Sequence, residues 1–320
     1  MQNIKKVLES PRPSVFRQVS DRSARFCIPR GNAYEVIHLN IKISADSTCD
    51  LSPELVEAYG IGITPLYIVM GEQTLRDGLD VKPADLYQRF RSTGKLCQTA
   101  AVNVADYIAF FKNQLETHDA VIHFTISSDM SGCYQNACIA AQDFDGRVFP
   151  VDARNLSTGI GHLVLDAADM AKEGRLTPAE IADVLNEKKA KLDVSFVLDT
   201  LEYLKAGGRC SSVAAFGANL LSLKPSIEVK NGAMGVGKKY RGKIVAAYKQ
   251  YITDRLKGHD DIDTKRIFIT DSGIDESIRQ ELHELVASLQ PFEEILHTQA
   301  GCTISQHCGP GCMGILYYHK

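Results

Sequence analysis

"AVIHFTISSDMSGCYQNACIAAQDF" (residues 120–144) contains a buried strand followed directly by a helix. Its first eight residues are mostly apolar or β-branched, and the run is short enough for a strand covered on both faces. Ser131 and Gly132 stand where the helical pattern begins. A strand followed at once by a helix is the repeating unit of a parallel sheet with helices on its faces. This stretch therefore predicts a parallel α/β fold.

The same alternation continues on both sides of this stretch. Ser52 is a predicted N-cap followed by Pro53, and Gly174 is a predicted helix end. The other predicted strands cover residues 41–45, 63–70 and 147–153, and the other predicted helices cover residues 82–93, 103–116 and 157–174. We expect an N-terminal α/β/α domain with a parallel sheet over residues 41–190, which places ligands beyond the carboxyl ends of its strands.

The pattern changes after a predicted connecting helix at residues 177–192. Asn231-Gly232 lies between two apolar runs, which is the strongest hairpin signal in the chain. Predicted strands at 194–200, 266–271, 293–298 and 314–319 are mixed with predicted helices at 201–208 and 276–290. This mixture of hairpins and helices predicts a C-terminal α+β domain with a mixed sheet over residues 191–320.

Composition and charge exclude several classes of protein. The chain has 320 residues with 36 basic and 39 acidic side chains, a net charge of −3, and no apolar run long enough for a membrane span. Nucleic acid and integral membrane segments are therefore not expected. The nine cysteines are an odd number without a secretory segment before them, which favours the reducing cytoplasm.

The first forty residues differ in charge from the remainder. Residues 1–40 carry seven Lys and Arg against three Asp and Glu, a net +4, so the remaining residues carry −7. We interpret residues 1–40 as a basic N-terminal extension outside the main fold. It is either a loosely packed extension, a basic tail for a partner, or a targeting segment. The net charge of −7 on the remaining residues disfavours a DNA-binding regulator that acts through this extension.

Three polar positions stand out as candidates for binding an anion. Ser131 lies at a helix start, where free backbone N–H groups favour anions, although it could equally act only as a helix cap. Thr99 lies in a short polar turn that the same predicted sheet edge could share with Ser131. Two hydroxyls converging there would suit a carboxylate or a phosphate. Arg209 follows two glycines and could bind an anion, dock a partner, or simply be solvated.

The segment "GCTISQHCGPGCMG" (residues 301–314) packs Cys302, His307, Cys308 and Cys312 close together. A zinc knuckle is conceivable, but no second Cys-x-x-Cys pair exists to complete four ligands. A redox pair is the second possibility. If the segment is extended, His307 and Cys308 point in opposite directions. We favour a Gly-Pro-Gly turn that directs His307 toward a ligand, with both cysteines as packing thiols.

Six motifs occur in a fixed order along the chain. They are "ADSTCDLSPEL", "TISSDMSGCYQNA", "LDTLEYLKAGGR", "LLSLKP" with the hairpin after it, "KKYRGK" and "HCGPGCMG". Together they resemble the DegV family of fatty-acid-binding proteins from about Ile41 to Tyr318. Each motif alone is modest, whereas the ordered set is specific.

This resemblance implies two α/β domains that enclose a long-chain fatty acid, with no cofactor. It implies a carrier that is not itself an enzyme, because a separate fatty acid kinase subunit phosphorylates the bound carboxylate to an acyl phosphate that feeds lipid metabolism. The carboxylate-binding residues of the family correspond to Thr99, Ser131 and His307. The residue associated with phosphotransfer or partner docking corresponds to Arg209. No residue of this chain is expected to be catalytic or to bind metal.

The chain departs from the family pattern in two places. Many members have Thr-Ser-Gln-Pro-Ser where this chain has "TAAVN" from Thr99, and relatives often have Val and Thr where it has Cys308 and Cys312. The alternative to a carrier is a stand-alone phosphotransferase or hydrolase that uses His307 with Ser131. That alternative lacks a Gly-x-Ser-x-Gly elbow, a nucleotide loop or a metal motif.

Overall fold

The computed structural model describes residues 39–211 and 223–320, so the predicted extension over residues 1–40 lies almost wholly outside the described residues. The N-terminal part is built on a parallel sheet in the order β2-β1-β6-β7. Its strands are β1 (Ile41–Asp46), β2 (Gly62–Thr64), β6 (Ala120–Thr125) and β7 (Val148–Asp152). Every residue of β6 is buried, as the apolar run predicts for a central strand.

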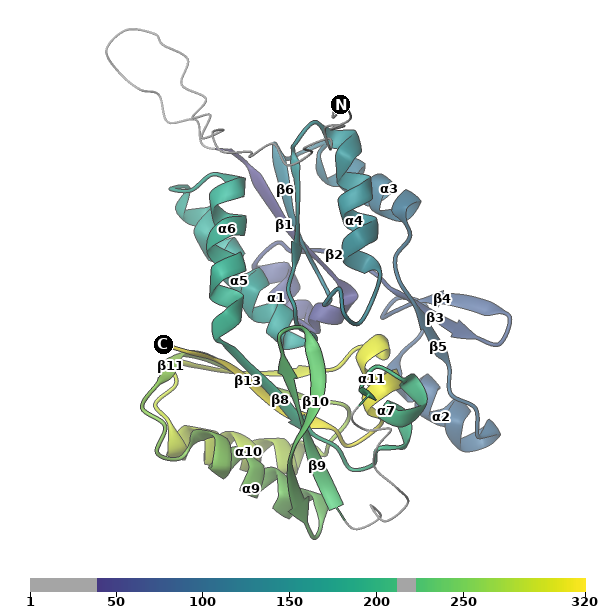
Figure 1. The fold of residues 1–320 in the computed structure, drawn as a ribbon, viewed down its shortest axis with the longest axis vertical. Coiled ribbons are helices and arrows are strands. Elements are labelled where there is room, and N and C mark those ends of the chain that lie inside the picture. The colour runs from purple at the N-terminus through teal and green to yellow at the C-terminus, as the bar shows by residue number, and fades with distance from the viewer. Residues whose placement is uncertain (1–38, 212–222) are drawn as a thin grey trace, which may run out of the picture. The chain divides into compact units, whose positions relative to one another are not determined.

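Helices cover both faces of this sheet (Figure 1). The helices α3 (Val104–Gln114) and α4 (Cys133–Ala141) lie on one face, and α5 (Thr158–Glu173) and α6 (Pro178–Lys188) lie on the other. Local signals define several of their ends. Asn103 caps α3 through a 2.9 Å bond from the Asp106 N–H, and Gly174 ends α5 with a left-handed φ of 65°.

The second large sheet is mixed, in the order β10-β9-β8-β13-β11-β12. Its strands are β8 (Leu192–Val197), β9 (Leu223–Lys230), β10 (Ala233–Arg241), β11 (Ile262–Asp271), β12 (Glu294–Gln299) and β13 (Met313–His319). Only β11 and β12 pair in parallel, and β9–β10 form the hairpin predicted at Asn231-Gly232. The predicted fold class, with a parallel sheet followed by a mixed sheet, is confirmed, and the boundary between residues 190 and 191 stays a prediction.

Side-chain alternation gives the mixed sheet two different faces. In β11, Ile267 and Ile269 pack in one apolar cluster with α9 (Ile244–Leu256) and α10 (Glu276–Leu289), whereas Phe268 packs in the other. That other cluster includes Phe124 of the parallel sheet and Leu163 of α5. Helix α5 contacts β1 and β6 on one side and β8 and β13 on the other. One continuous core therefore joins the two large sheets through α5.

A third, small sheet corrects two predictions. Residues 63–70 do not form one strand: β2 ends before Pro65, which has no N–H to donate, and β3 (Tyr67–Met70) begins a separate antiparallel sheet. This sheet has the order β4-β3-β5, with β4 (Gln73–Arg76) and β5 (Gln98–Ala100). Thr99, predicted in a turn, lies in the middle of β5 and pairs with Ile68. The remaining helices are α1 (Pro53–Ala58), α2 (Pro83–Thr93), α7 (Glu202–Gly207) and α11 (Cys302–Cys308).

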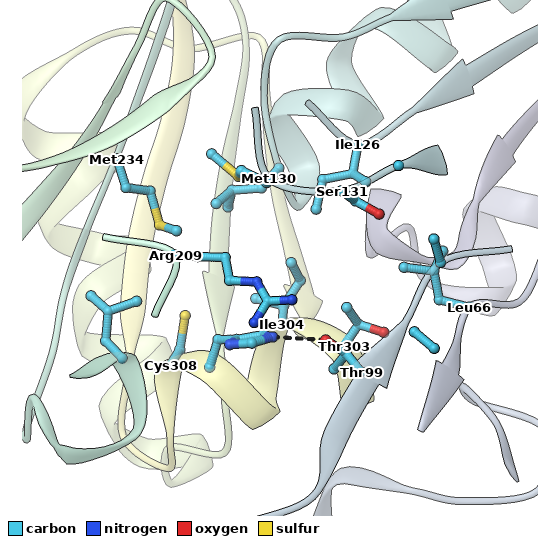
Figure 2. Close-up of a pocket in the computed structure, with 16 residues that line it drawn as sticks. Leu66, Thr99, Ile126, Met130, Ser131, Arg209, Met234, Thr303, Ile304 and Cys308 are labelled. Carbon is cyan, nitrogen blue, oxygen red and sulfur yellow. Dashed lines mark hydrogen bonds between the residues drawn. The ribbon is translucent and has the colours of Figure 1, made fainter. Parts of the chain in front are cut away.

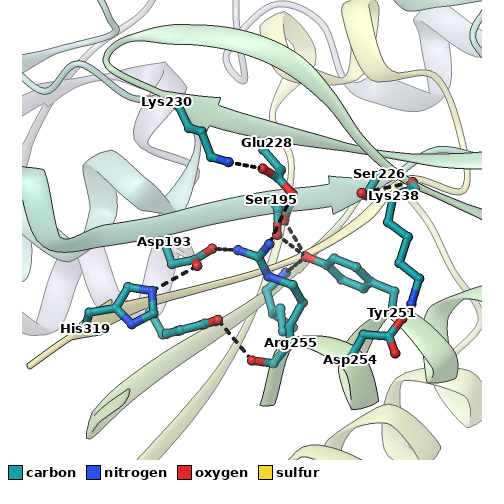
Figure 3. Close-up of polar contacts among 12 residues, drawn as sticks. Asp193, Ser195, Ser226, Glu228, Lys230, Lys238, Tyr251, Asp254, Arg255 and His319 are labelled. Atoms are coloured by element: carbon teal, nitrogen blue, oxygen red, sulfur yellow. Dashed lines mark hydrogen bonds and ion pairs between the residues drawn. The ribbon is translucent and has the colours of Figure 1, made fainter. Parts of the chain in front are cut away.

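Helix α9 was not predicted, because contacts with the sheet rather than local signals hold it in place (Figure 3). No side chain caps its N-terminus at Lys243. Arg255 instead forms ion pairs with Asp193 and Glu228, and the Tyr251 hydroxyl donates to the Ser195 carbonyl at 2.7 Å. Within residues 39–211 and 223–320, no helix combines the length and the apolar character needed to cross a membrane.

Candidate functional site

A cavity of about 260 Å³ lies where the three sheets approach one another. Most of the residues that line it are apolar, and only a few are polar or charged. The lining residues are Leu66, Thr99, Ala100, Ala101, Ile126, Met130, Ser131, Gly132, Leu156, Leu204, Arg209, Met234, Thr303, Ile304, His307 and Cys308. Thr99, Ser131, Arg209 and His307, the four residues singled out in the sequence, therefore line one cavity (Figure 2).

His307 and Thr99 are in direct contact. The Nε2 atom of His307 lies 3.0 Å from the hydroxyl of Thr99, although the two residues are 208 positions apart in the chain. Burial, together with the nearby charge of Arg209, lowers the pKa of His307 to about 4. The imidazole is therefore neutral at pH 7. Its Nδ1 atom is buried without a hydrogen-bond partner.

Gly207 fixes the position of this imidazole. A Cβ atom at residue 207 would stand 2.1 Å from Nδ1 of His307, so no larger residue fits there without displacing the ring. The next residue, Gly208, ends α7 with a left-handed φ of 67°. Arg209 follows and donates from its guanidinium to the Gly207 carbonyl at 2.7 Å. The two glycines therefore bring Arg209 and His307 to the same wall.

Helix α11 carries His307, and the carboxyl groups of Asp77 and Asp50 accept backbone N–H groups at its N-terminus. Gly301 at the N-cap has no side chain, but Asp77 accepts the N–H groups of Cys302 at 2.8 Å and Thr303 at 3.0 Å. Asp50 accepts the Gly301 N–H at 2.8 Å. Burial raises the pKa of Asp50 to about 8, against the lowering effect of its bond with Ser157. Residues 302–308 are helical, which corrects the extended geometry considered for His307 and Cys308.

Ser131 approaches the cavity from the loop between β6 and α4. Gly132, not Ser131, occupies the N-cap position of α4, and the Cys133 N–H reaches the Ser131 hydroxyl only at 3.4 Å. The same hydroxyl donates to the Cys133 sulfur at 3.2 Å. Ser131 is half-buried and directs its hydroxyl into the cavity from the side opposite Arg209 (Figure 2).

A buried polar network that sequence reasoning missed lies behind Ser131. The Tyr107 hydroxyl donates to Asp46 at 2.6 Å, and His123 approaches the same carboxylate at 3.2 Å. Tyr107 also hydrogen-bonds with Cys133. Burial, followed by the charge of Asp46, raises the pKa of Tyr107 well above its usual value. Cys133 is therefore held between this network and the hydroxyl of Ser131. Asp46 is the second residue of the "ADSTCDL" motif, which is the one sequence signal that could have pointed to it.

Cys308 and Cys312 are both free and buried. The Cys308 thiol hydrogen-bonds with that of Cys312, and this bond together with burial raises the pKa of Cys312 well above its usual value. A thiol that stays protonated is a poor metal ligand and a poor nucleophile, which favours packing thiols. In the part of the chain that the structure describes, no group of three or more His, Cys, Asp or Glu could hold a metal ion.

The four predicted residues line one cavity but come from other elements than expected, and their roles in binding stay a prediction. Thr99 and Ser131 do not come from consecutive crossovers of one parallel sheet, because Thr99 belongs to the small antiparallel sheet. His307 contacts Thr99, and Ser131 contacts Cys133. The arrangement offers the hydroxyls of Thr99, Ser131 and Thr303, a neutral imidazole and a guanidinium on the walls of a mostly apolar cavity.

Comparisons with known proteins agree along the same part of the chain. The model of a family described as uncharacterised proteins of the DegV family matches residues 40–320. A DegV domain-containing protein of Caldanaerobacter subterraneus is 32% identical over 88% of this chain and 99% of its own.

Two solved structures show the same similarity. The structure of a DegV family protein from Thermus thermophilus, described for its fatty acid binding, aligns with a TM-score of 0.79 and 32% identity over 88% of this chain and 100% of that one. A stearic acid-binding protein of Eubacterium ventriosum aligns with a TM-score of 0.75 and 26% identity over 88% of this chain and 98% of that one. The chain belongs to the DegV family.

Proposed function

We propose that this protein binds a long-chain fatty acid in the cavity and presents its carboxylate to a separate kinase, which forms an acyl phosphate for lipid metabolism. The observation that carries the proposal is an apolar cavity with Thr99, Ser131, Arg209 and His307 on its walls. Ligand sites of this kind are apolar with a few convergent polar groups. The fatty acid binding of the Thermus thermophilus relative supports it. A cytoplasmic location is part of the same proposal.

The head group would be held by hydroxyl groups and a nearby positive charge. We infer that the neutral His307 keeps its proton on Nε2 and donates it to the Thr99 oxygen, 3.0 Å away. The Thr99 hydroxyl is then free to donate its own proton to the carboxylate. Ser131 would donate from the opposite side, and Arg209 would balance the negative charge. These groups bind an anion without a metal or cofactor.

The acyl tail would extend away from the head group along the apolar walls of the cavity. A smaller cavity of about 20 Å³ shares Leu156, Ile304 and Cys308 with the first and continues between Val194 and Phe196 of β8 and other residues of the mixed sheet. We infer that a long chain widens this continuation as it enters. Burying a sixteen-carbon tail supplies roughly 0.8 kcal/mol per CH₂, or about 11 kcal/mol before ordering costs. The tail therefore supplies most of the affinity, and the head group sets the orientation.

A stand-alone enzyme using His307 and Ser131 is less well supported. Such an enzyme needs the imidazole within hydrogen-bond reach of the serine hydroxyl. In this structure the hydroxyl of Ser131 donates to Cys133, and His307 is paired with Thr99. A carrier whose chemistry is performed by a partner fits these contacts better.

Titration of delipidated protein with palmitate tests the proposal. We expect binding close to one fatty acid per chain, and copurification of a fatty acid detectable by native mass spectrometry. Protein purified after expression should also release a long-chain fatty acid on extraction. If delipidated, folded protein takes up no fatty acid of any length from C14 to C18, the carrier function is wrong.

A further inference from the structure

A chain of buried polar groups leads from Asp46 to Ser131 at the wall of the cavity. Its links are Tyr107 of α3 and Cys133 of α4, which are fully buried, as is Asp46 at the end of β1. The Tyr107 hydroxyl, at 2.6 Å, and His123, at 3.2 Å, both contact the Asp46 carboxylate. A carboxylate accepts hydrogen bonds and has none to donate, so it fixes the direction of the chain at this end.

The direction of each following bond is set by the bond before it. Tyr107 has one proton and donates it to Asp46, so its oxygen can only accept the bond that it shares with Cys133. The Cys133 thiol therefore donates to Tyr107, and its sulfur is left as an acceptor. Ser131, whose hydroxyl lies 3.2 Å from this sulfur, must supply the proton of the last bond. The Ser131 proton thus points toward α4, and its oxygen can only accept within the cavity.

The bond between Ser131 and Cys133 is the weakest link of this chain. A thiol sulfur is a weak acceptor, whereas the bond from Tyr107 to the Asp46 carboxylate is short and charge-assisted. A ligand carboxylate is a far stronger acceptor than sulfur. It can therefore draw the Ser131 proton into the cavity while the bonds between Cys133, Tyr107 and Asp46 stay in place. An oxygen atom in place of the sulfur would hold that proton more firmly.

We propose that Cys133 and Tyr107 are positioning residues that set the direction of the Ser131 hydroxyl and thereby the choice between lipid head groups. This inference rests on the proposed function and deepens it. A carboxylate needs the Ser131 proton and has to displace the sulfur of Cys133 to obtain it. A head group with a hydroxyl of its own, such as a fatty alcohol or a protonated fatty acid, can donate to Ser131 without that displacement. The site therefore also accepts lipids whose head group donates a proton.

The affinities of the purified chain for palmitate and for hexadecan-1-ol, which have equal chain lengths, test this inference. Cys133→Ala removes the sulfur that accepts from Ser131. Tyr107→Phe removes the acceptor of the thiol proton, which can then turn to the Ser131 oxygen. Both changes free the Ser131 proton for the cavity, so each should raise the preference for palmitate over the alcohol about three- to tenfold, the worth of one hydrogen bond. Cys133→Ser should lower the preference, because oxygen is the better acceptor.

Two controls separate this role from a loss of packing. Cys138→Ala makes the same substitution further along α4, outside the lining of the cavity, and should leave the preference unchanged. When Ser131→Ala is already present, Cys133→Ala and Tyr107→Phe should no longer shift the preference, because no hydroxyl remains to turn. Damage to packing would instead weaken the binding of both lipids alike. The two substitutions act on the same proton by separate routes, so one folded variant is enough for the test.

The outcomes distinguish this inference from the proposed function. Folded parent protein that binds neither lipid overturns the proposed function. A parent that binds palmitate but has no measurable affinity for hexadecan-1-ol leaves the carrier function intact and overturns the inference. The same holds if the preference in the folded variants at Cys133 and Tyr107 equals that of the parent. A shift that persists in the presence of Ser131→Ala overturns the inference as well, because it cannot act through the Ser131 proton.

Discussion

Thr99 and Ser131 reach the cavity from opposite walls, and each presents one hydroxyl to it. A hydrogen bond to a charged group contributes roughly 1.5–3 kcal/mol, which is several times less than the burial of a long acyl tail. Thr99→Val or Ser131→Ala should therefore weaken palmitate binding about ten- to a hundredfold without abolishing it. Isothermal titration of the single and double variants measures this effect.

The double variant of these residues is the more informative measurement. Because both hydroxyls would contact the same carboxylate, the double change should cost less than the sum of the two single changes. Thr99→Ser keeps the hydroxyl and should bind like the parent. If Ser131→Ala binds palmitate as tightly as the parent, Ser131 acts only at the start of α4, and its assignment to the head group is wrong.

The candidate site residues were predicted mainly from the resemblance of motifs to a known family and less from local sequence patterns. The contact between Thr99 and His307 joins positions 208 residues apart, and no periodicity encodes such a distance. The network of Asp46, Tyr107 and His123 was missed for a related reason. Each of its residues lies within a predicted strand or helix. The sequence does not show which polar partner such a side chain meets, because the partner comes from another element of the fold.

At the scale of elements, helix α11 depends on residues outside itself. Asp77 is buried and accepts two of its first N–H groups, from Cys302 and Thr303. Asp77→Asn removes a charge and one acceptor from this site, so we expect a loss of roughly 2 kcal/mol in the free energy of unfolding. Palmitate affinity should also fall, because α11 carries His307. Denaturant unfolding and titration measure the two effects.

Asp80 provides the matched control for this prediction. It lies three residues further along the chain and pairs with Arg76 at 2.8 Å on the surface. An exposed ion pair contributes about 0–1 kcal/mol, so Asp80→Asn should change stability little and palmitate binding not at all. Equal effects of Asp77→Asn and Asp80→Asn would show that the carboxylate of Asp77 does not anchor α11.

Several of the elements that sequence patterns predicted carry their own end signals. Ser52 and Asn103 cap α1 and α3 through their side chains, and Thr177 forms a capping box with Glu180 at the start of α6. The elements that were missed lack such signals. Helix α9 has no side-chain cap, α11 is capped by Asp77 from a distant loop, and β4 and β5 are short strands defined by their partners.

At the scale of the whole molecule, His162 joins the two large sheets. It lies on α5, is fully buried, and donates from Nε2 to the Leu316 carbonyl of β13 at 2.9 Å. Its Nδ1 atom has no partner. Burial is the main cause that lowers the pKa of His162 to about 4, while the bond to Leu316 acts in the opposite direction. Protonation of Nδ1 would place an unpaired charge in the core.

This histidine should make the protein sensitive to acid. Its pKa is about 4 when folded and about 6.5 when unfolded, so the unfolded chain binds more protons between these values. Stability is therefore fully present above pH 6.5 and falls as the pH drops toward 4, by roughly 3 kcal/mol from this group. In His162→Gln, which has no titrating group, unfolding midpoints should decline less over that range. Parallel declines in variant and parent would contradict the assignment.

The position of β13 in the mixed sheet has a consequence for synthesis on the ribosome. This strand lies between β8 and β11, yet it follows both in the sequence. Until residues 313–319 have been made, β8 and β11 each present an unpaired edge, and a gap remains in the middle of the sheet. His307 also emerges late, so a nascent chain has no complete site. The growing polypeptide must therefore avoid premature association during translation, and the cavity is lined completely only after α11 has been made.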